Sequence, residues 1–599
     1  MIYHCEDHTC NYWDEGEKLP ERCPQCGRKL LRANEADMTG DDWTALGNTL
    51  WDAEASDKKR MVDCFRKAAY LGSAWGVCNL GICMEQGNGV EADPVQAFWL
   101  YQQAVEMGSL NAVCCLGVCY QYGIGTAPDA KQAAELYCKA AEYGSPRGQM
   151  LLARAFHDGI GVEADAAEAV YWVRAAAYQR YGEGMHRLGV CYEYGDGVEQ
   201  NWEHAVHWFR EAAESGVGVA MTDLGYCYEK GCGVEQSWEQ AFSWYRRGAE
   251  CGDPVSMCNL GLCYKMGHGV EQNWQEAIKW YEQGAQCGDL QSMNNLAYCY
   301  ERGEGVEQNE DRAFYWYRRS AEGGNGSAMC NLGRCYKRGY GVEQNWQEAV
   351  KWYEQGAQCG NLQSMHNLAC CYEHGEGVEQ NMTEAIRWYT AAAEGGNADD
   401  MYELGWQYDH GEGVEQDMKK AICWYERAAE QNHPAAMNSL GECYAMGRGV
   451  PRDLETAMEW YRRAAELGEA MADYNMGWHL EQAGKLSEAY THYRKAADGN
   501  DDSAWWALGR FYENGVVVAQ DGKEARRCYE TGEKLGSVKC KMRLARCKLL
   551  GIGGRRAKKA GLDLCRQALE LAKESSEKED YGYEAEMNLL RRTIAENES

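Results

Sequence analysis

Residues 253–288 read DPVSMCNLGLCYKMGHGVEQNWQEAIKWYEQGAQCG, and this stretch decides the fold. Asp253 and Pro254 are typical of the N-cap and first position of a helix, because the aspartate accepts a backbone N–H and proline has none to satisfy. Apolar residues then follow at helical spacing from Met257. A Gly-x-Gly pair starting at Gly267 ends this helix, since glycine adopts the left-handed C-cap conformation without a Cβ clash.

The second half of the stretch predicts another helix. Asn273 is the expected N-cap, and Glu276 lies three residues later, as in a capping box. Ala277, Tyr281 and Ala285 recur at helical spacing and predict the face that packs on the first helix. The stretch therefore encodes two antiparallel helices of roughly 12–14 residues joined by a glycine turn.

This pattern repeats along the chain and is marked by a Leu-Gly or Leu-Ala dipeptide. The marker leucine recurs every 36 residues, at Leu80, Leu116, Leu152, Leu188, Leu224, Leu260, Leu296, Leu332, Leu368, Leu404 and Leu440. Leu46 precedes this run, and Met476, Leu508 and Leu544 continue it at nearly the same spacing. A period of this length predicts an all-α solenoid, an α/α superhelix of about fifteen 36-residue helix pairs.

Composition and charge narrow the function classes. The 599 residues carry a net charge of −31, which disfavours binding to phosphate backbones or anionic membranes. No stretch approaches the roughly 18 apolar residues of a membrane helix. The first residues lack the basic and apolar regions of a secretory signal, and 30 cysteines without such a signal are typical of the reducing cytoplasm.

Two stretches carry a resemblance to a known family. They are LGVCYEYGDGV followed by AVHWFREAAESG, from Leu188, and LGECYAMGRGV followed by AMEWYRRAAELG, from Leu440. Both resemble the Sel-one-like repeat, a relative of the tetratricopeptide repeat, and the resemblance covers about 540 residues. It implies a right-handed superhelix that serves as a scaffold for protein–protein interaction.

The N-terminal region differs from the repeats. Cys5, Cys10, Cys23 and Cys26 form two pairs, and the second pair lies in a CPQCG knuckle, whose tight turn can direct two thiolates at one ion. This arrangement resembles a rubredoxin-type zinc ribbon. A segment of about 34 residues needs such a staple to fold. We therefore expect a structural Zn²⁺ held by these four cysteines in a module at 1–34, although His4 or His8 could substitute as a ligand. Iron and thiols without a metal are the alternatives.

Cysteines also recur within the repeats, three residues after the marker leucine. They could form a metal ladder, or they could fill the core of the first helix as small apolar side chains. We favour core filling, because one cysteine per repeat, about 10 Å from the next, cannot surround one ion.

Candidate partner-binding residues follow from comparing the repeats with one another. In tetratricopeptide repeats, the positions two, five and six residues past the marker face the concave groove, and here those positions vary between repeats. Their cations and aromatics predict a groove for a protein or peptide partner, in particular an acidic peptide. The candidates are Tyr226, Lys265, Tyr298, Arg302, Arg334, Lys337, Arg338 and Trp406. Alternatively, the cations only neutralise neighbouring glutamates.

The C-terminal region reverses the charge. Nine lysines and arginines crowd into residues 539–559, beyond or at the end of a solenoid expected over 35–550. They predict either a helical cap at 551–599 that pairs with the acidic repeats, or a nucleic-acid patch. We find no catalytic motif such as H-E-x-x-H or G-x-S-x-G, so an enzyme is not expected. A protein scaffold is the favoured function, and a nucleic-acid-linked regulator using the ribbon and the basic stretch is the alternative.

Overall fold

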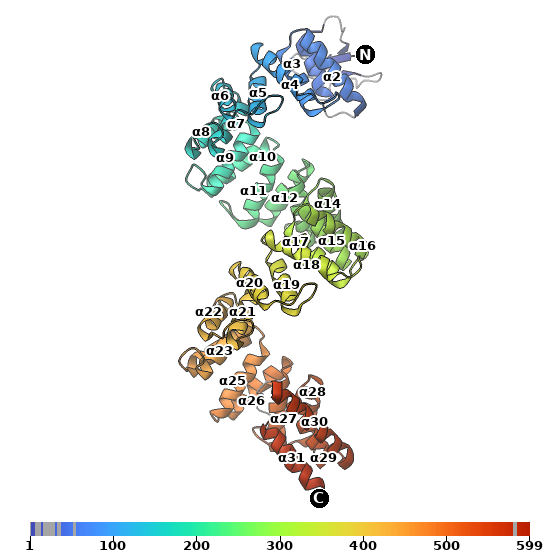
Figure 1. The fold of residues 1–599 in the computed structure, drawn as a ribbon, viewed down its shortest axis with the longest axis vertical. Helices are drawn as coiled ribbons and strands as arrows, with labels where there is room; N and C mark the ends of the chain where they lie inside the picture. Colours follow the sequence, from blue (N-terminus) through green and yellow to red (C-terminus); the bar gives the residue numbers. More distant parts are fainter. Residues whose placement is uncertain are drawn as a thin grey trace. The chain divides into compact units, whose positions relative to one another are not determined.

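The computed structural model describes residues 2–5, 13–15, 30–32, 38–51, 55–578 and 584–598. Within these ranges it forms a succession of antiparallel helix pairs (Figure 1). No helix of the described ranges is long and apolar enough to cross a membrane.

Each pair has a first helix, which contains the marker residue. The first helices are α1 (Gly40–Thr49), α3 (Ala74–Gln86), α5 (Leu110–Tyr122), α7 (Pro146–Asp158), α9 (Gly182–Tyr194), α11 (Gly218–Lys230), α13 (Pro254–Met266), α15 (Leu290–Arg302), α17 (Gly326–Arg338), α19 (Leu362–His374), α21 (Ala398–His410), α23 (Pro434–Met446), α25 (Ala470–Gln482), α27 (Asp502–Asn514) and α29 (Val538–Leu550). These fifteen first helices match the fifteen units expected from the period.

The second helices are α2 (Ala55–Tyr70), α4 (Pro94–Glu106), α6 (Ala130–Glu142), α8 (Ala166–Tyr178), α10 (Trp202–Glu214), α12 (Trp238–Glu250), α14 (Trp274–Gln286), α16 (Glu310–Glu322), α18 (Trp346–Gln358), α20 (Met382–Glu394), α22 (Met418–Glu430), α24 (Leu454–Glu466), α26 (Leu486–Asp498), α28 (Gly522–Lys534) and α30 (Lys558–Lys578). A last helix, α31 (Glu584–Glu598), packs on both α29 and α30.

The helix ends are those that the sequence predicts. The Asp253 side chain accepts the backbone N–H of Ser256, and Pro254 occupies the first turn of α13. The Asn273 side chain caps α14 by accepting the N–H groups of Gln275 and Glu276. These caps satisfy donors that the helices leave unpaired, and so they define the ends of each helix.

Glycine is required where the chain turns and where the two helices of a pair approach closely. Gly269 has a φ of +69°, and a Cβ there would lie 2.2 Å from the carbonyl oxygen of Trp238. A Cβ on Gly261, next to the marker leucine, would lie 2.5 Å from the Cε1 atom of Tyr281. The first helix therefore offers a flat backbone surface on which the tyrosine ring of the second helix packs.

The core is a row of these contacts. Tyrosine rings of the second helices are buried at the same position in most repeats, together with the marker leucines. The cysteines three past the marker are buried as well, among them Cys83, Cys227, Cys299 and Cys443. Burial raises the pKa of the Cys83 thiol to about 11, which keeps it protonated. The interpretation of these cysteines as core-filling residues is confirmed.

The described part of the chain forms two compact units, Met1–Asn309 and Glu310–Ser599. Within each unit, a first helix contacts the first helix of the next repeat, for example α11 with α13 and α17 with α19. Successive first helices are thus neighbours within each unit. The 36-residue period gives no sign of the boundary between the units.

Strands occur near the N-terminus. The strands β1 (Ile2–Cys5), β2 (Trp13–Glu15) and β3 (Leu30–Arg32) form an antiparallel sheet in the order β2-β1-β3. Tyr3 pairs with Asp14 on one side and with Arg32 on the other. Cys10, Cys23 and Cys26 lie outside the described residues, as does the side chain of Cys5. The predicted zinc ribbon therefore stays a prediction.

Candidate binding groove

In the first unit, three candidate residues lie together on neighbouring first helices. The Nζ atom of Lys265, on α13, lies 4.5 Å from the ring centroid of Tyr298, on α15. The guanidinium carbon of Arg302 lies 5.7 Å from the same ring. Two cations thus share one aromatic ring, and Arg302 is exposed whereas Lys265 and Tyr298 are half-buried. This arrangement presents positive charge beside an apolar surface.

Tyr226 belongs to the preceding first helix, α11. Its side chain is 44% exposed, and the Nζ atom of Lys230 lies 5.8 Å from its ring centroid. Lys230 also forms an ion pair of 2.8 Å with Glu229. At this point of the groove the cation is therefore partly neutralised by its neighbour.

In the second unit, Arg334, Lys337 and Arg338 all lie on α17, where the spacing of a helix places them near one another. Lys337 forms an ion pair of 3.6 Å with Glu376, and its Nζ atom lies 4.9 Å from the ring of Trp346. Trp406, on α21, stacks on His410 with ring centroids 4.4 Å apart. The sequence grouped Trp406 with these cations, whereas the structure separates it from α17 by the intervening first helix α19.

Lys265 occupies a position whose side chain, in several other repeats, bonds to a buried core tyrosine. Five residues past the marker, several repeats carry a glutamate that accepts a hydrogen bond from the buried tyrosine of the second helix, as Glu229 does from Tyr245 at 2.9 Å. Lys265 cannot accept such a bond. Among the described residues, the buried hydroxyl of Tyr281 accordingly has no hydrogen-bond partner. An unpaired buried hydroxyl costs about 1–3 kcal/mol. The presence of Lys265 therefore lowers the stability of this repeat.

A polar network that the sequence did not reveal occupies the same face of the second unit. The Nδ1 atom of His366, on α19, lies 2.7 Å from an oxygen of Asp400, on α21, whose side chain is fully buried. The hydrogen bond to Asp400 raises the pKa of His366 to about 10. Burial, in turn, raises the pKa of the Asp400 carboxyl. Asp400 does not occupy a groove position, and only its contact with His366 identifies it.

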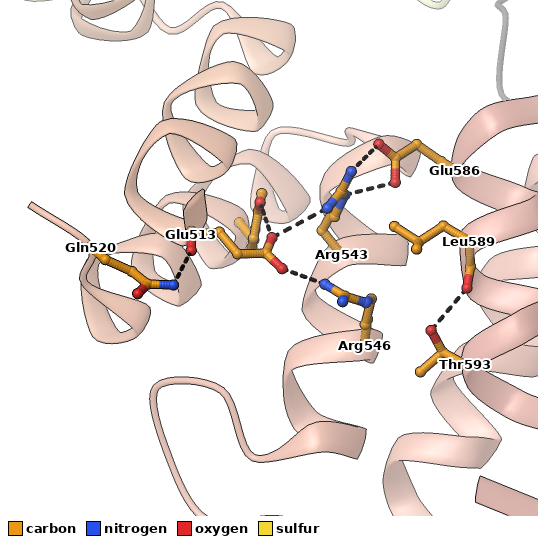
Figure 2. A network of polar contacts seen from close by, with 8 residues as sticks. Glu513, Gln520, Arg543, Arg546, Glu586, Leu589 and Thr593 are labelled. Atoms are coloured by element: carbon orange, nitrogen blue, oxygen red, sulfur yellow. Dashed lines mark hydrogen bonds and ion pairs between the residues drawn. The ribbon is translucent and has the colours of Figure 1, made fainter. Parts of the chain in front are cut away.

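Two arginines of the basic C-terminal stretch take part in the packing of the last helices (Figure 2). Arg543 donates two hydrogen bonds of 2.7 Å to Glu586 of α31 and one of 3.3 Å to Glu513 of α27. Arg546 also pairs with Glu513. Both glutamates are nearly buried, so these arginines neutralise buried carboxylates instead of presenting charge to solvent. Glu513 belongs to a repeat helix, whereas Glu586 lies within the expected cap, and the cap at 551–599 stays a prediction.

No group of three or more metal-ligating side chains capable of holding an ion occurs among the residues whose side chains the structure describes. Within that part of the chain, the cysteines are free thiols, and Cys251, Cys287 and Cys359 are exposed at the ends of second helices. The metal prediction therefore concerns only the N-terminal cysteines.

Taken together, the helix pairs, their period and the row of buried tyrosines define an all-helical repeat solenoid. The Sel1 repeat model matches thirteen segments, at residues 76–109, 112–145, 146–181, 182–217, 218–253, 254–289, 290–325, 326–361, 362–397, 398–433, 434–469, 470–501 and 504–537. The chain belongs to the Sel1 repeat family, and the resemblance seen in its sequence is confirmed.

Two solved structures have sequences similar to that of this chain. A protective antigen of uropathogenic Escherichia coli strains, described as having an SLR fold, is 32% identical over 75% of this chain and 97% of its own, with a TM-score of 0.49. A Sel1 repeat protein from Oxalobacter formigenes is 33% identical over 41% of this chain and 96% of its own, with a TM-score of 0.38. No curated protein matches the chain at a significant level.

Proposed function

We propose that this protein is a non-enzymatic scaffold that binds an acidic peptide segment of a partner protein along the face formed by its first helices. The observation that carries the proposal is Lys265, which replaces a hydrogen-bond acceptor, leaves the Tyr281 hydroxyl unpaired and directs its ammonium group to Tyr298. Sequences break their own structural rules mainly where function requires it. A chain with a net charge of −31 would repel an acidic peptide elsewhere, so local cations would also guide the peptide to this face.

The chemistry of the face suits carboxylates and apolar side chains together. Arginine can bind a carboxylate through two parallel hydrogen bonds, and Arg302 and Arg338 are both exposed. The rings of Tyr226 and Tyr298 can cover apolar side chains of the same peptide. Each unit carries its own cluster, around Tyr298 in the first and on α17 in the second.

The proposal is tested with a panel of fluorescently labelled peptides in pairs. One member of each pair contains several Asp and Glu residues, and the other carries Asn and Gln at the same positions. Anisotropy titrations should show that the acidic member binds more tightly, and that its affinity falls as salt is raised. Equal binding of both members would contradict the proposal.

A variant pair locates the binding on the first helices. Arg334→Glu with Arg338→Glu should abolish capture of an acidic peptide and leave helicity unchanged. Lys351→Glu with Arg387→Glu is the matched control, because it makes the same change of charge at exposed positions of the second helices α18 and α20. If both double variants weaken binding equally, only the net charge matters and the groove assignment is wrong.

The alternative, a nucleic-acid-linked regulator, receives less support. Arg543 and Arg546 of its basic stretch are engaged by Glu513 and Glu586. The zinc ribbon, which both functions could use, remains a separate proposal: Cys5, Cys10, Cys23 and Cys26 would bind one structural Zn²⁺.

A further inference from the structure

The second helices place an aromatic ring at one fixed position, 21 residues past most of the marker leucines. From the first repeat to the fourteenth, this position holds Phe65, Tyr101, Tyr137, Val173, Phe209, Tyr245, Tyr281, Tyr317, Tyr353, Tyr389, Tyr425, Tyr461, Tyr493 and Tyr529. Every member of this row is buried. Within these fourteen repeats, Val173 is the one residue of the row without a ring, whereas the fifteenth repeat holds Cys565 at 21 residues past Leu544.

The ring has two contacts in an ordinary repeat. It packs on the residue that follows the marker, as Tyr101 does on Gly81, where a Cβ would lie 2.7 Å from the ring. Its hydroxyl donates to the side chain five past the marker, as Tyr101 does to Glu85 at 2.5 Å and Tyr529 to Glu513 at 2.8 Å. The ring thus spans the distance from the first helix to the polar edge of the groove.

In the repeat that contains Val173, the ring and the acceptor of its hydroxyl are both replaced, whereas an alanine after the marker also occurs in the repeats of Tyr317 and Tyr389. Ala153 follows the marker leucine, and His157 stands where Glu85 stands in its own repeat. His157 turns to two carboxylates instead, with its Nδ1 atom 2.6 Å from Asp158 and its Nε2 atom 3.2 Å from Asp196 of the next repeat. Neither the ring nor the acceptor of its hydroxyl is therefore present in this repeat.

A cavity of about 420 Å³ lies where these groups are missing. Its floor includes Ala153, Val170 and Val173, which are buried and apolar. Its rim includes Arg154, His157 and Arg187, on α7 and α9. The volume is at the lower end of the range of small-molecule pockets, so it accommodates a single ring more readily than an extended ligand.

The charged residues at the rim disfavour a simple anion. Arg187 lies 3.7 Å from Asp196, and Arg154 lies 3.8 Å from Asp158. Each arginine therefore already faces a carboxylate, and Glu183 also lines the cavity, so the lining carries a slight excess of negative charge. A neutral ring with a polar end fits better: its face can contact a guanidinium, and its hydroxyl can bond to the carboxylates beside His157.

We infer that this cavity binds the side chain of a tyrosine residue of the partner peptide, which takes the place of the ring that the row lacks at Val173. The inference rests on the proposed function, since it supplies an anchor for a peptide lying along the first helices. It differs from the acidic-peptide proposal in the residues it uses, because the cavity belongs to α7, α8 and α9.

The test uses small probes that need no partner protein. p-Cresol represents the side chain alone, and N-acetyl-tyrosinamide represents the residue within a peptide. Saturation-transfer NMR and calorimetry on the full chain should detect both probes, and N-acetyl-leucinamide should bind at least about tenfold more weakly. Absence of p-cresol binding would overturn the inference. Binding of p-cresol without N-acetyl-tyrosinamide would indicate a site for free phenols, which also contradicts it.

A variant whose own side chains fill the cavity complements the probe experiment. Val173→Tyr combined with Ala153→Gly restores the ring and the flat surface on which it packs, so the variant should melt at or above the temperature of the unaltered protein and should no longer bind either probe. Conversely, Tyr245→Val, two repeats further along the chain, should create a second p-cresol site. Unchanged probe binding by the filled variant would show that the ring binds elsewhere.

These outcomes separate the inference from the proposed function. If the filled variant loses the probes but binds acidic peptides that contain tyrosine as tightly as before, the cavity is not a peptide anchor and the inference fails, while the scaffold function stands. If probe binding behaves as expected but no acidic peptide binds, the scaffold proposal fails at the groove cations.

Discussion

The ammonium group of Lys265 lies 4.5 Å from the ring centroid of Tyr298, which belongs to the next repeat. This contact joins two first helices through residues at variable positions, whereas the invariant positions of the same helices form the core. A cation held over an aromatic ring keeps its full charge, and such pairs contribute about 0.5–1 kcal/mol at exposed sites. Under the proposed function, this contact would give a strongly acidic chain a local site for an acidic peptide.

The C-terminal cap depends on Arg543. Arg543→Ala would leave the nearly buried carboxylate of Glu586 unpaired, and breaking such a pair costs about 3–5 kcal/mol. We expect α31 to detach locally, so that hydrogen exchange of its amides increases sharply while exchange in α13 and α14 is unchanged. Arg555→Ala is the control, because it removes an exposed arginine of the same stretch. Equal protection of α31 in both variants would show that the cap is held by apolar contacts alone.

The pair of His366 and Asp400 should make stability depend on pH. The pKa of His366 is about 10 in the folded protein, above its usual value near 6.5, so folding is favoured by protonation. This contribution is fully present below pH 6.5 and is lost as the pH rises through 10. His366→Asn should therefore lower the melting temperature clearly at pH 6 and hardly at pH 10.

The near-copy of this repeat supplies the control for His366. Residues 271–297 and 343–369 differ at three positions, one of which is Asn294 in place of His366. Two repeats before Asp400 the chain has Ala328. The double variant His366→Asn with Asp400→Ala reproduces these residues. Its melting temperature should therefore not show the loss that the unaltered pair causes as the pH rises towards 10. A constant difference from the unaltered protein across pH 6–10 would mean that His366 does not titrate as described.

The N-terminal cysteines should bind metal. Elemental analysis of the purified chain is expected to give one zinc ion per molecule, because four thiolates provide a closed tetrahedral site. Cys23→Ser with Cys26→Ser should release it. The exposed thiols of Cys251 and Cys287 serve as the control pair, and their replacement by serine should leave the zinc content unchanged. Iron in place of zinc would identify a rubredoxin-type centre, and no bound metal would refute the ribbon.

The repeat architecture could be predicted almost completely from the sequence, because each of its determinants recurs. Asp253, Asn273 and Gly269 act within a few residues of their own positions, so the caps and turns follow from local chemistry. The buried cysteines follow from helical spacing. For the same reason the number of helix pairs was predicted correctly, although the handedness of the superhelix remains an expectation.

Contacts between repeats could not be predicted in this way. The bonds of Arg543 reach residues 30 and 43 positions away, and His366 reaches Asp400 across 34. Such pairs depend on rotamers and on the exact approach of two helices, which a period does not specify. Val173 illustrates a second reason. A comparison that looks for the residues common to all repeats does not reveal a position at which one repeat differs from the others. A search for the missing ring would have indicated the cavity.

The most direct test of the scaffold proposal is a binding titration of one acidic peptide to Lys265→Glu. Glutamate at this position can accept the hydrogen bond of Tyr281, as Glu229 does from Tyr245, and a bond of this kind contributes about 1 kcal/mol. Lys279→Glu, on the exposed side of α14, is the control for charge. The account predicts that Lys265→Glu weakens the peptide at least about tenfold relative to this control without lowering the melting temperature. Unchanged affinity, together with a lower melting temperature, would show that Lys265 serves only the fold and would contradict the account.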